Sequence, residues 1–120
     1  MIMIAGPYRS GTNDDPNLIA ANVHAMNVAA VQVYRLGHIP MLGEWLALPL
    51  IETAGSKEKG DEIFNEIFHP IAHAIAKRCD ACLRIGGPSQ GADGMVDLAR
   101  AHNQKVFHSI DEIPAFTGEK

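Results

Sequence analysis

The sequence predicts an α/β fold, a flavodoxin-like (Rossmann-like) parallel sheet with strand order 2-1-3-4 and helices on both faces. Short apolar runs that end at turn-forming residues alternate with longer segments of helical periodicity, which is the pattern of strand–helix–strand units joined by right-handed crossovers. The chain has 120 residues, of which 47% are hydrophobic. This is enough for one hydrophobic core and not for two, so we expect a single domain over residues 1–120.

The first half of the chain reads as strand, helix and strand. The apolar run 2–5 ends at Gly6-Pro7 and predicts a strand buried on both faces. A long helix follows, ending near Gly37, and 38–42 returns as the second strand. The apolar face of this helix is formed by Ile19, Val23, Met26, Ala30 and Val33, which recur at spacings of three and four.

The segment 43–51 is apolar, and its periodicity leaves open a short helix or an irregular loop. Glu44 and Trp45 lie just past the second strand, where ligands of open parallel sheets bind. A further helix carries Phe64, Ile67, Phe68, Ile71 and Ile75 on one side. Pro70 interrupts its pattern and predicts a kink or a break at His69.

The last part of the chain reads as strand, helix and strand again. The apolar run 81–85 predicts a buried third strand, 92–102 a helix and 105–108 a fourth strand. Residues 109–114 begin like a capped turn, and we expect 117–120 to fray.

A turn-rich loop, 86–91, joins the third strand to the helix that follows it. The first backbone N–H groups of a helix have no partner within it and lie at the positive end of its dipole, so they can hold a phosphate. Ser89 can add a hydroxyl, and the glycines let a ligand approach closely. An ordinary βα turn, in which Gly and Pro only shape the bend, is the alternative.

A second polar loop, 6–17, follows the first strand. In the order 2-1-3-4 the first and third strands are neighbours, so both loops line one crevice. Arg9, Ser10 and the helix start at Gly91 can then converge on an anion, with Arg9 offering a planar fork of donors. The alternatives are a solvated Arg9 and a Tyr8 that packs over the strand end instead of contacting a ligand.

Three motifs carry a resemblance to a known family: Ala5-Gly6-Pro7-Tyr8-Arg9, Cys79-Asp80, and 87–93 with the sequence Gly-Pro-Ser-Gln-Gly-Ala-Asp. In element order they resemble the nucleoside 2-deoxyribosyltransferase superfamily, which includes the 2'-deoxynucleoside 5'-phosphate N-hydrolases. The resemblance implies binding of a nucleoside or its 5'-monophosphate, and a homodimer or higher homo-oligomer whose neighbouring subunit completes the site. We expect no cofactor. By similarity, Ser89 matches a phosphate-contacting serine.

The sequence departs from this family at its catalytic positions. The family's Glu nucleophile falls on Met95, and an assisting Asp falls on Ala72. Neither side chain can serve as a nucleophile or an acid. Hydrolysis would then need Glu44 or Asp93 as a general base for direct attack by water, and these two are the predicted catalytic residues. The residues predicted to bind the ligand are Gly6, Tyr8, Arg9, Ser10, Gly11, Ser89, Gly91 and Met95.

The remaining features narrow the function classes. A net charge of −4 argues against a grip on a nucleic acid polymer, and no apolar run or leader pattern predicts a membrane span or a signal peptide, so we expect a cytoplasmic protein. The CxxC pair Cys79 and Cys82 is expected to be core. Three functions stay open: a nucleotide N-glycosidase with altered catalytic groups, a non-catalytic nucleotide sensor or binding subunit, and a metal protein. The last would use the helical stripe Glu62, Glu66, His69 and His73, whose alternative is a solvated helix face.

Overall fold

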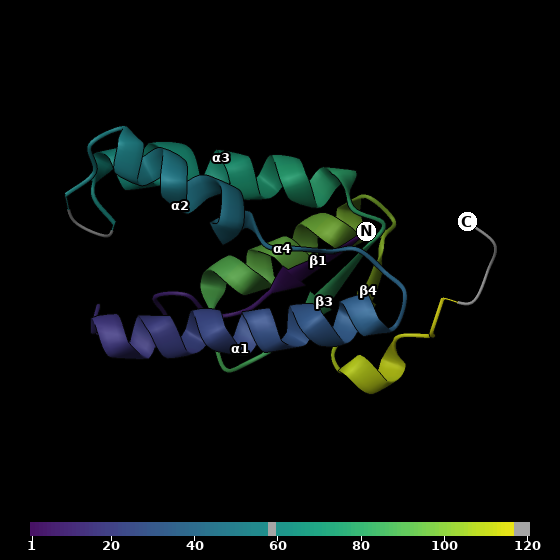
Figure 1. Cartoon of the computed structure of the whole chain (residues 1–120). Coiled ribbons are helices and arrows are strands. Elements are labelled where there is room, and N and C mark those ends of the chain that lie inside the picture. Colours follow the sequence, from purple (N-terminus) through teal and green to yellow (C-terminus); the bar gives the residue numbers. More distant parts are fainter. Residues whose placement is uncertain (58–59, 117–120) are drawn as a thin grey trace.

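The computed structural model describes residues 1–57 and 60–116. Four parallel strands form one sheet in the order β2-β1-β3-β4 (Figure 1), which confirms the predicted α/β, flavodoxin-like topology. The strands are β1 (Ile2–Ala5), β2 (Pro40–Met41), β3 (Ala81–Arg84) and β4 (Lys105–Phe107).

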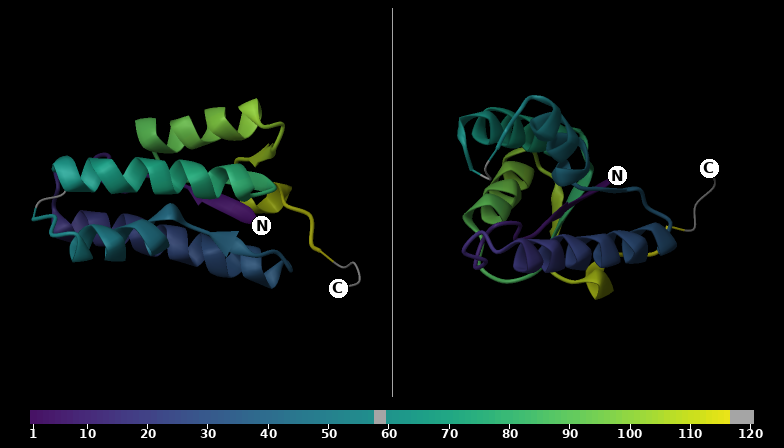
Figure 2. Two further views of the ribbon diagram at one scale, coloured as in Figure 1. Left: turned by 90° about the horizontal axis from the view of Figure 1, so that it is seen from above. Right: turned by 60° about the vertical axis from the view of Figure 1, so that its left-hand side comes forward.

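Helices cover both faces of this sheet (Figure 2). They are α1 (Pro16–Arg35), α2 (Gly43–Thr53), α3 (Glu62–Arg78) and α4 (Gln90–Ala101), with a 3-10 turn η1 (Ile110–Glu112) after β4. The apolar segment after the second strand is therefore a helix, which the sequence pattern left open. Within residues 1–57 and 60–116, no helix is long and apolar enough to cross a membrane.

Strand β1 shows why both faces need helices. Ile2 and Ile4 pack into a cluster with the buried side of α1, whereas Met3 and Ala5 pack against α3 and α4. Alternate residues of a strand point to opposite faces, so an entirely apolar strand is buried only between two layers. The carboxyl end of β1 therefore opens between the two helix layers.

The second strand is shorter than the predicted 38–42. His38 is used elsewhere, because its backbone N–H donates to the carbonyl of Val33 at the end of α1 and its ring contacts the carbonyl of Pro114. Gly37, at φ +95°, makes the turn that ends the helix, as expected. Only Pro40 and Met41 pair with β1.

Helix α3 continues through Pro70, so of the predicted kink or break at His69 the break is wrong. A proline inside a helix leaves the carbonyl four residues earlier without its usual donor. Here that carbonyl belongs to Glu66, and both Glu66 and Pro70 are exposed, so water can take the donor's place. Phe64 before the proline and Ala72 and Ala76 after it are buried and fix both halves.

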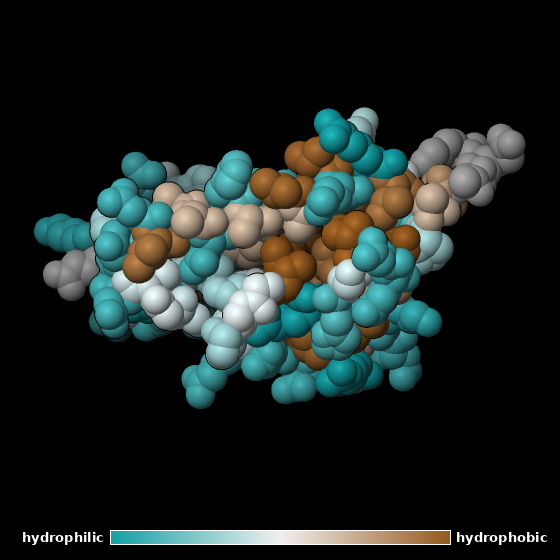
Figure 3. Space-filling model, turned by 90° about the horizontal axis from the view of Figure 1, so that it is seen from below, coloured by the Kyte–Doolittle hydropathy of each residue, from teal (hydrophilic) through white to brown (hydrophobic). Residues whose placement is uncertain are grey.

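The sequence stretch 45–51 is only partly covered. Ala47 and Ile51 are buried, while Trp45, Leu46 and Leu50 are exposed. Trp45 also borders a shallow groove between α1 and α2, and its indole N–H donates to Asn27 of α1 at 2.9 Å. Figure 3 shows one face on which apolar side chains gather among hydrophilic ones. The capped turn expected at 109–114 is η1, capped by Ser109, whereas 117–120 lies outside the described residues.

Candidate functional site

A cavity of about 190 Å³ opens at the carboxyl ends of β1 and β3. The loops after these two strands meet there: a Cβ built on Gly86 would lie 2.6 Å from the Cδ of Pro7. Gly86 has a φ of +79°, a conformation that glycine adopts without strain. The contact places the two loops side by side, as the strand order predicted.

Most of the predicted site residues line this cavity. They are Gly6, Tyr8, Arg9 and Ser10 from the first loop, Glu44 from α2, and Ser89, Gly91 and Met95 from the loop and helix after β3. Gly11 and Asp93 are not among the lining residues. Gly11 is exposed in a positive-φ turn.

Ser89 is the N-cap of α4 and is 8% exposed. Its Oγ accepts a hydrogen bond from the backbone N–H of Ala92 at 3.2 Å, and its carbonyl accepts from Asp93. The backbone N–H groups of Gln90 and Gly91 come before Ala92 in the first turn of α4 and have no partner within the helix. The serine hydroxyl keeps its own proton, so three donors lie at the positive end of the helix dipole.

Arg84 holds the loop that leads to this helix start. Its guanidinium donates to the carboxylate of Asp93 at 3.0 Å, to the carbonyl of Gly87 at 2.8 Å and to the carbonyl of Ile85. The Asp93 carboxylate is thus engaged outside the cavity and is not placed to act as a general base there. Sequence reasoning passed over Arg84, although a lone Arg at the end of an apolar strand was a signal for such a role.

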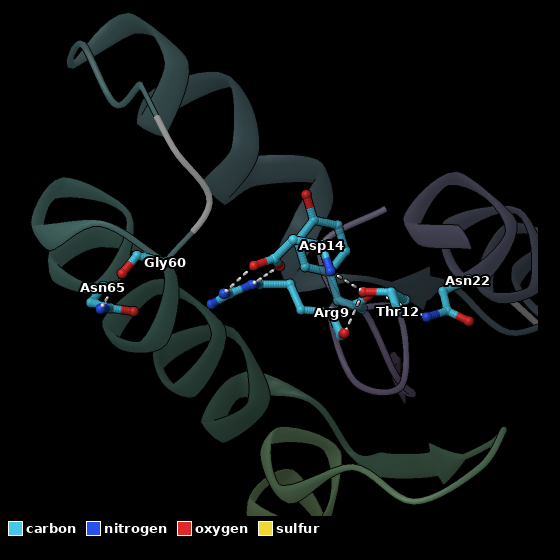
Figure 4. Close-up of polar contacts among 7 residues, drawn as sticks. Arg9, Thr12, Asp14, Asn22, Gly60 and Asn65 are labelled. Atoms are coloured by element: carbon cyan, nitrogen blue, oxygen red, sulfur yellow. Dashed lines mark hydrogen bonds and ion pairs between the residues drawn. The ribbon is translucent and has the colours of Figure 1, made fainter. Parts of the chain in front are cut away.

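Arg9 lines the same cavity from the first loop, and Figure 4 shows its contacts with that loop. Its guanidinium makes two hydrogen bonds to Asp14, at 2.9 and 3.1 Å, and lies 5.8 Å from the centre of the Phe64 ring. The hydrogen bonds to Asp14 raise the pKa of Arg9. The two side chains are 37% and 51% exposed, so the pair contributes little to stability. Arg9 can exchange this partner for an anionic ligand at small cost.

The first loop is braced beneath Arg9. Thr12 is buried and its Oγ1 donates to the carbonyl of Arg9 and accepts from the N–H of Asp14 (Figure 4). Asn22 of α1 donates to the carbonyl of Tyr8 at 3.0 Å. These bonds fix the direction in which Tyr8 and Arg9 leave β1.

Three stacked aromatic rings form the apolar side of the cavity. The ring centres of Tyr8 and Phe68 are 5.8 Å apart, those of Tyr8 and Phe64 6.2 Å, and those of Phe64 and Phe68 5.1 Å. Phe64 and Phe68 belong to α3, where sequence periodicity identified them only as core residues. Burial, followed by the nearby Glu44 carboxylate, raises the pKa of the Tyr8 hydroxyl.

Glu44 lies in the first turn of α2 and is only 7% exposed. Burial raises the pKa of its carboxyl above the ordinary value of 4.5, and its own backbone N–H partly opposes this shift. Glu44 therefore combines a helix-start position, where the helix dipole favours a carboxylate, with a place on the cavity wall. A buried carboxyl of raised pKa in a cavity is a feature of functional sites.

Met95 and Ala72, the two positions that the family resemblance singled out, both line the cavity. Met95 is buried on α4 and Ala72 on α3, and they belong to one apolar cluster. The Cβ of Ala72 packs against Gly43, where an added Cβ would lie 3.0 Å away. The positions converge, but both are apolar here.

The other candidate clusters do not form sites. Across residues 1–57 and 60–116, no group of three His, Cys, Asp or Glu side chains could hold a metal ion, although the ring centres of His69 and His73 are 6.4 Å apart. Cys79 and Cys82 are buried free thiols, and burial raises the pKa of Cys82 to about 11. Such thiols are unreactive, as expected of core residues.

Compared with protein-family models, with curated proteins and with solved structures, the chain gives no match.

Proposed function

We propose that this protein binds a nucleoside 5'-monophosphate in the cavity between β1, β3 and α4. The observation that carries the proposal is the convergence of Ser89, the start of α4 and Arg9 on one cavity. Backbone N–H groups at a helix start, a hydroxyl and a guanidinium are the donors that phosphate sites use.

The remaining walls suit the rest of such a ligand. At about 190 Å³ the cavity is smaller than the roughly 300 Å³ at which pockets for whole drug-sized ligands begin, so it encloses part of a nucleotide. We place the phosphate against Ser89 and the sugar between Tyr8 and Glu44. The base then lies at the mouth, where the aromatic side chains offer a surface for stacking.

A catalytic version of this proposal, cleavage of the N-glycosidic bond, has one supporting observation. Glu44 is a buried carboxyl on the cavity wall, and burial raises its pKa, which makes it a stronger base than an exposed carboxylate. Since Met95 offers no nucleophile, cleavage would proceed by direct attack of water. Release of free base from a deoxynucleoside monophosphate separates this version from a nucleotide sensor or binding subunit.

A thermal-shift comparison tests the binding proposal. A ligand at a hundredfold excess over its dissociation constant stabilises the folded state by roughly 2.7 kcal/mol. We expect a nucleoside 5'-monophosphate to raise the melting temperature and the double variant Ser89→Ala, Arg9→Ala to remove the rise. An equal rise with the nucleoside that lacks the phosphate would contradict the phosphate site.

We also expect a cytoplasmic protein that forms at least a dimer, with no cofactor and no nucleic acid polymer as its partner. The exposed apolar side chains Trp45, Leu46 and Leu50 support the expectation of a contact between copies. The shallow groove that Trp45 borders with α1 would then belong to that contact.

A further inference from the structure

Glu44 is a buried carboxyl without a partner from any other residue in the described part of the chain. No hydrogen bond or ion pair joins it to another side chain or to another residue's backbone within 1–57 and 60–116, and no cation lowers its pKa. Buried charged groups are almost always paired, because burial without a partner is strongly unfavourable. Glu44 therefore needs a specific explanation.

At least one carboxylate oxygen of Glu44 must reach open space, because its own backbone N–H is the one donor to this carboxyl among the described residues. Among the described residues, no side-chain nitrogen or oxygen is both fully enclosed and without a hydrogen-bond partner. Because Glu44 is only 7% exposed and lines the cavity, the open space that this oxygen reaches is the cavity. The carboxyl thus points an unused acceptor into the ligand site.

The position of Glu44 in the sheet gives the cavity two unlike poles. Glu44 follows β2, Tyr8 follows β1, and Ser89 follows β3. The strand order is β2-β1-β3, and neighbouring strands are roughly 4.8 Å apart, so Glu44 and Ser89 are anchored on strands about 10 Å apart. One pole supplies donors for an anion, and the other supplies a carboxyl.

We propose that Glu44 accepts hydrogen bonds from hydroxyl or N–H groups of the ligand, at the pole opposite the phosphate. The site therefore takes a phosphate ester of a small organic group that carries such donors. Bare phosphate leaves the Glu44 pole empty, and a second anionic group there is repelled by the carboxylate. For the phosphate pole, this inference rests on the proposed function.

A structural role and a ligand-binding role for Glu44 predict opposite effects of Glu44→Gln on the stability of the free protein. A structural carboxyl stabilises the fold, so Glu44→Gln would lower the melting temperature of the free protein. An unpaired carboxyl held for a ligand destabilises the free protein. The neutral variant Glu44→Gln then raises the melting temperature of the free protein and lowers its affinity for the ligand. The two readouts move in opposite directions only if the residue serves binding.

Calorimetric titration of the full chain with three probes tests the inference: a nucleoside 5'-monophosphate, ribose 5-phosphate and inorganic phosphate. Hydrogen bonds to a charged group correspond to a roughly 10- to 100-fold loss of affinity when removed. Glu44→Gln should lower the affinity for the nucleotide by at least tenfold and leave the affinity for inorganic phosphate unchanged. The matched control is Glu52→Gln, a change of the same chemistry on α2 at an exposed residue outside this cavity.

The arms of this titration separate the sources of the donors and the ways of failing. If Glu44→Gln lowers the affinity for both ribose 5-phosphate and the nucleotide, the sugar hydroxyls are the donors. If it lowers only the affinity for the nucleotide, the donors are N–H groups of the base. Unchanged affinity of Glu44→Gln for both organic phosphates overturns the inference and leaves the phosphate site standing. A wild type that binds none of the three probes overturns the proposed function and this inference together.

Discussion

Replacing Ser89 should reduce stability and ligand binding by two separable routes. Its Oγ caps α4 through the N–H of Ala92, and loss of a serine cap to alanine costs about 1 kcal/mol, whereas replacement by glycine costs only a few tenths. For a domain of 120 residues the entropy of unfolding is roughly 0.25 kcal/mol/K. Ser89→Ala should therefore lower the melting temperature by about 4 °C and Ser89→Gly by about 1 °C.

Binding should depend on the hydroxyl and not on the cap. Both Ser89 variants lose the hydroxyl, so both should lose most of the stabilisation by a nucleoside 5'-monophosphate, despite their different melting temperatures. Asp15→Ala is the control, because Asp15 caps α1 by accepting from Asn17 at 2.8 Å and does not line the cavity. Thermal denaturation with and without ligand measures both effects. An undiminished ligand response in Ser89→Gly would refute the role of the hydroxyl.

Three further predictions follow from the site and the surface. Because the pKa of Glu44 is raised, the folded state holds this proton more tightly than the unfolded state. The stability that the proton contributes is therefore full below about pH 4.5 and is lost as the pH rises through the folded pKa. Glu44→Gln should remove this decline in stability, as measured by urea titrations at several pH values. Met95→Glu combined with Ala72→Asp should create release of free base from a deoxynucleoside monophosphate, measured by chromatography. The unaltered protein should exchange no base between nucleosides. Robust exchange by the unaltered protein would show that the family nucleophile is not at Met95. Light scattering at micromolar concentration should give more than one subunit, and a monomer would argue against a shared site.

The arrangement of the sheet was predictable because it depends on burial of short apolar segments. Strands such as 2–5 and 81–85 carry no polar residue that would place one face in water, apart from Arg84 near the end of the second of them. The two errors, at His38 and Pro70, have different causes. The backbone N–H of His38 bonds back to Val33 of α1 instead of starting β2. Pro70 stays within α3 because buried residues fix the helix on both sides of it.

The site was predictable in outline and not in its contacts. The strand order alone placed Arg9 and Ser89 around one crevice. The pairing of Arg9 with Asp14 depends on a loop in which Asn13 and Asp14 both have positive φ, and no pattern in the sequence specified that conformation. Likewise, the helical spacing of Phe64 is that of a core residue. It faces the cavity only because α3 packs over the strand ends.

The most direct test is an amide chemical-shift map of the isotope-labelled protein during titration with a nucleoside 5'-monophosphate. A phosphate held at the start of α4 should shift the backbone amides of Gln90, Gly91 and Ala92 first and most strongly, with smaller shifts at Gly6 and Ser10 across the cavity. The same titration with the unphosphorylated nucleoside should leave the α4 amides in place. Shifts centred instead on the groove between α1 and α2, or no shifts at millimolar nucleotide, would contradict nucleotide binding at this cavity.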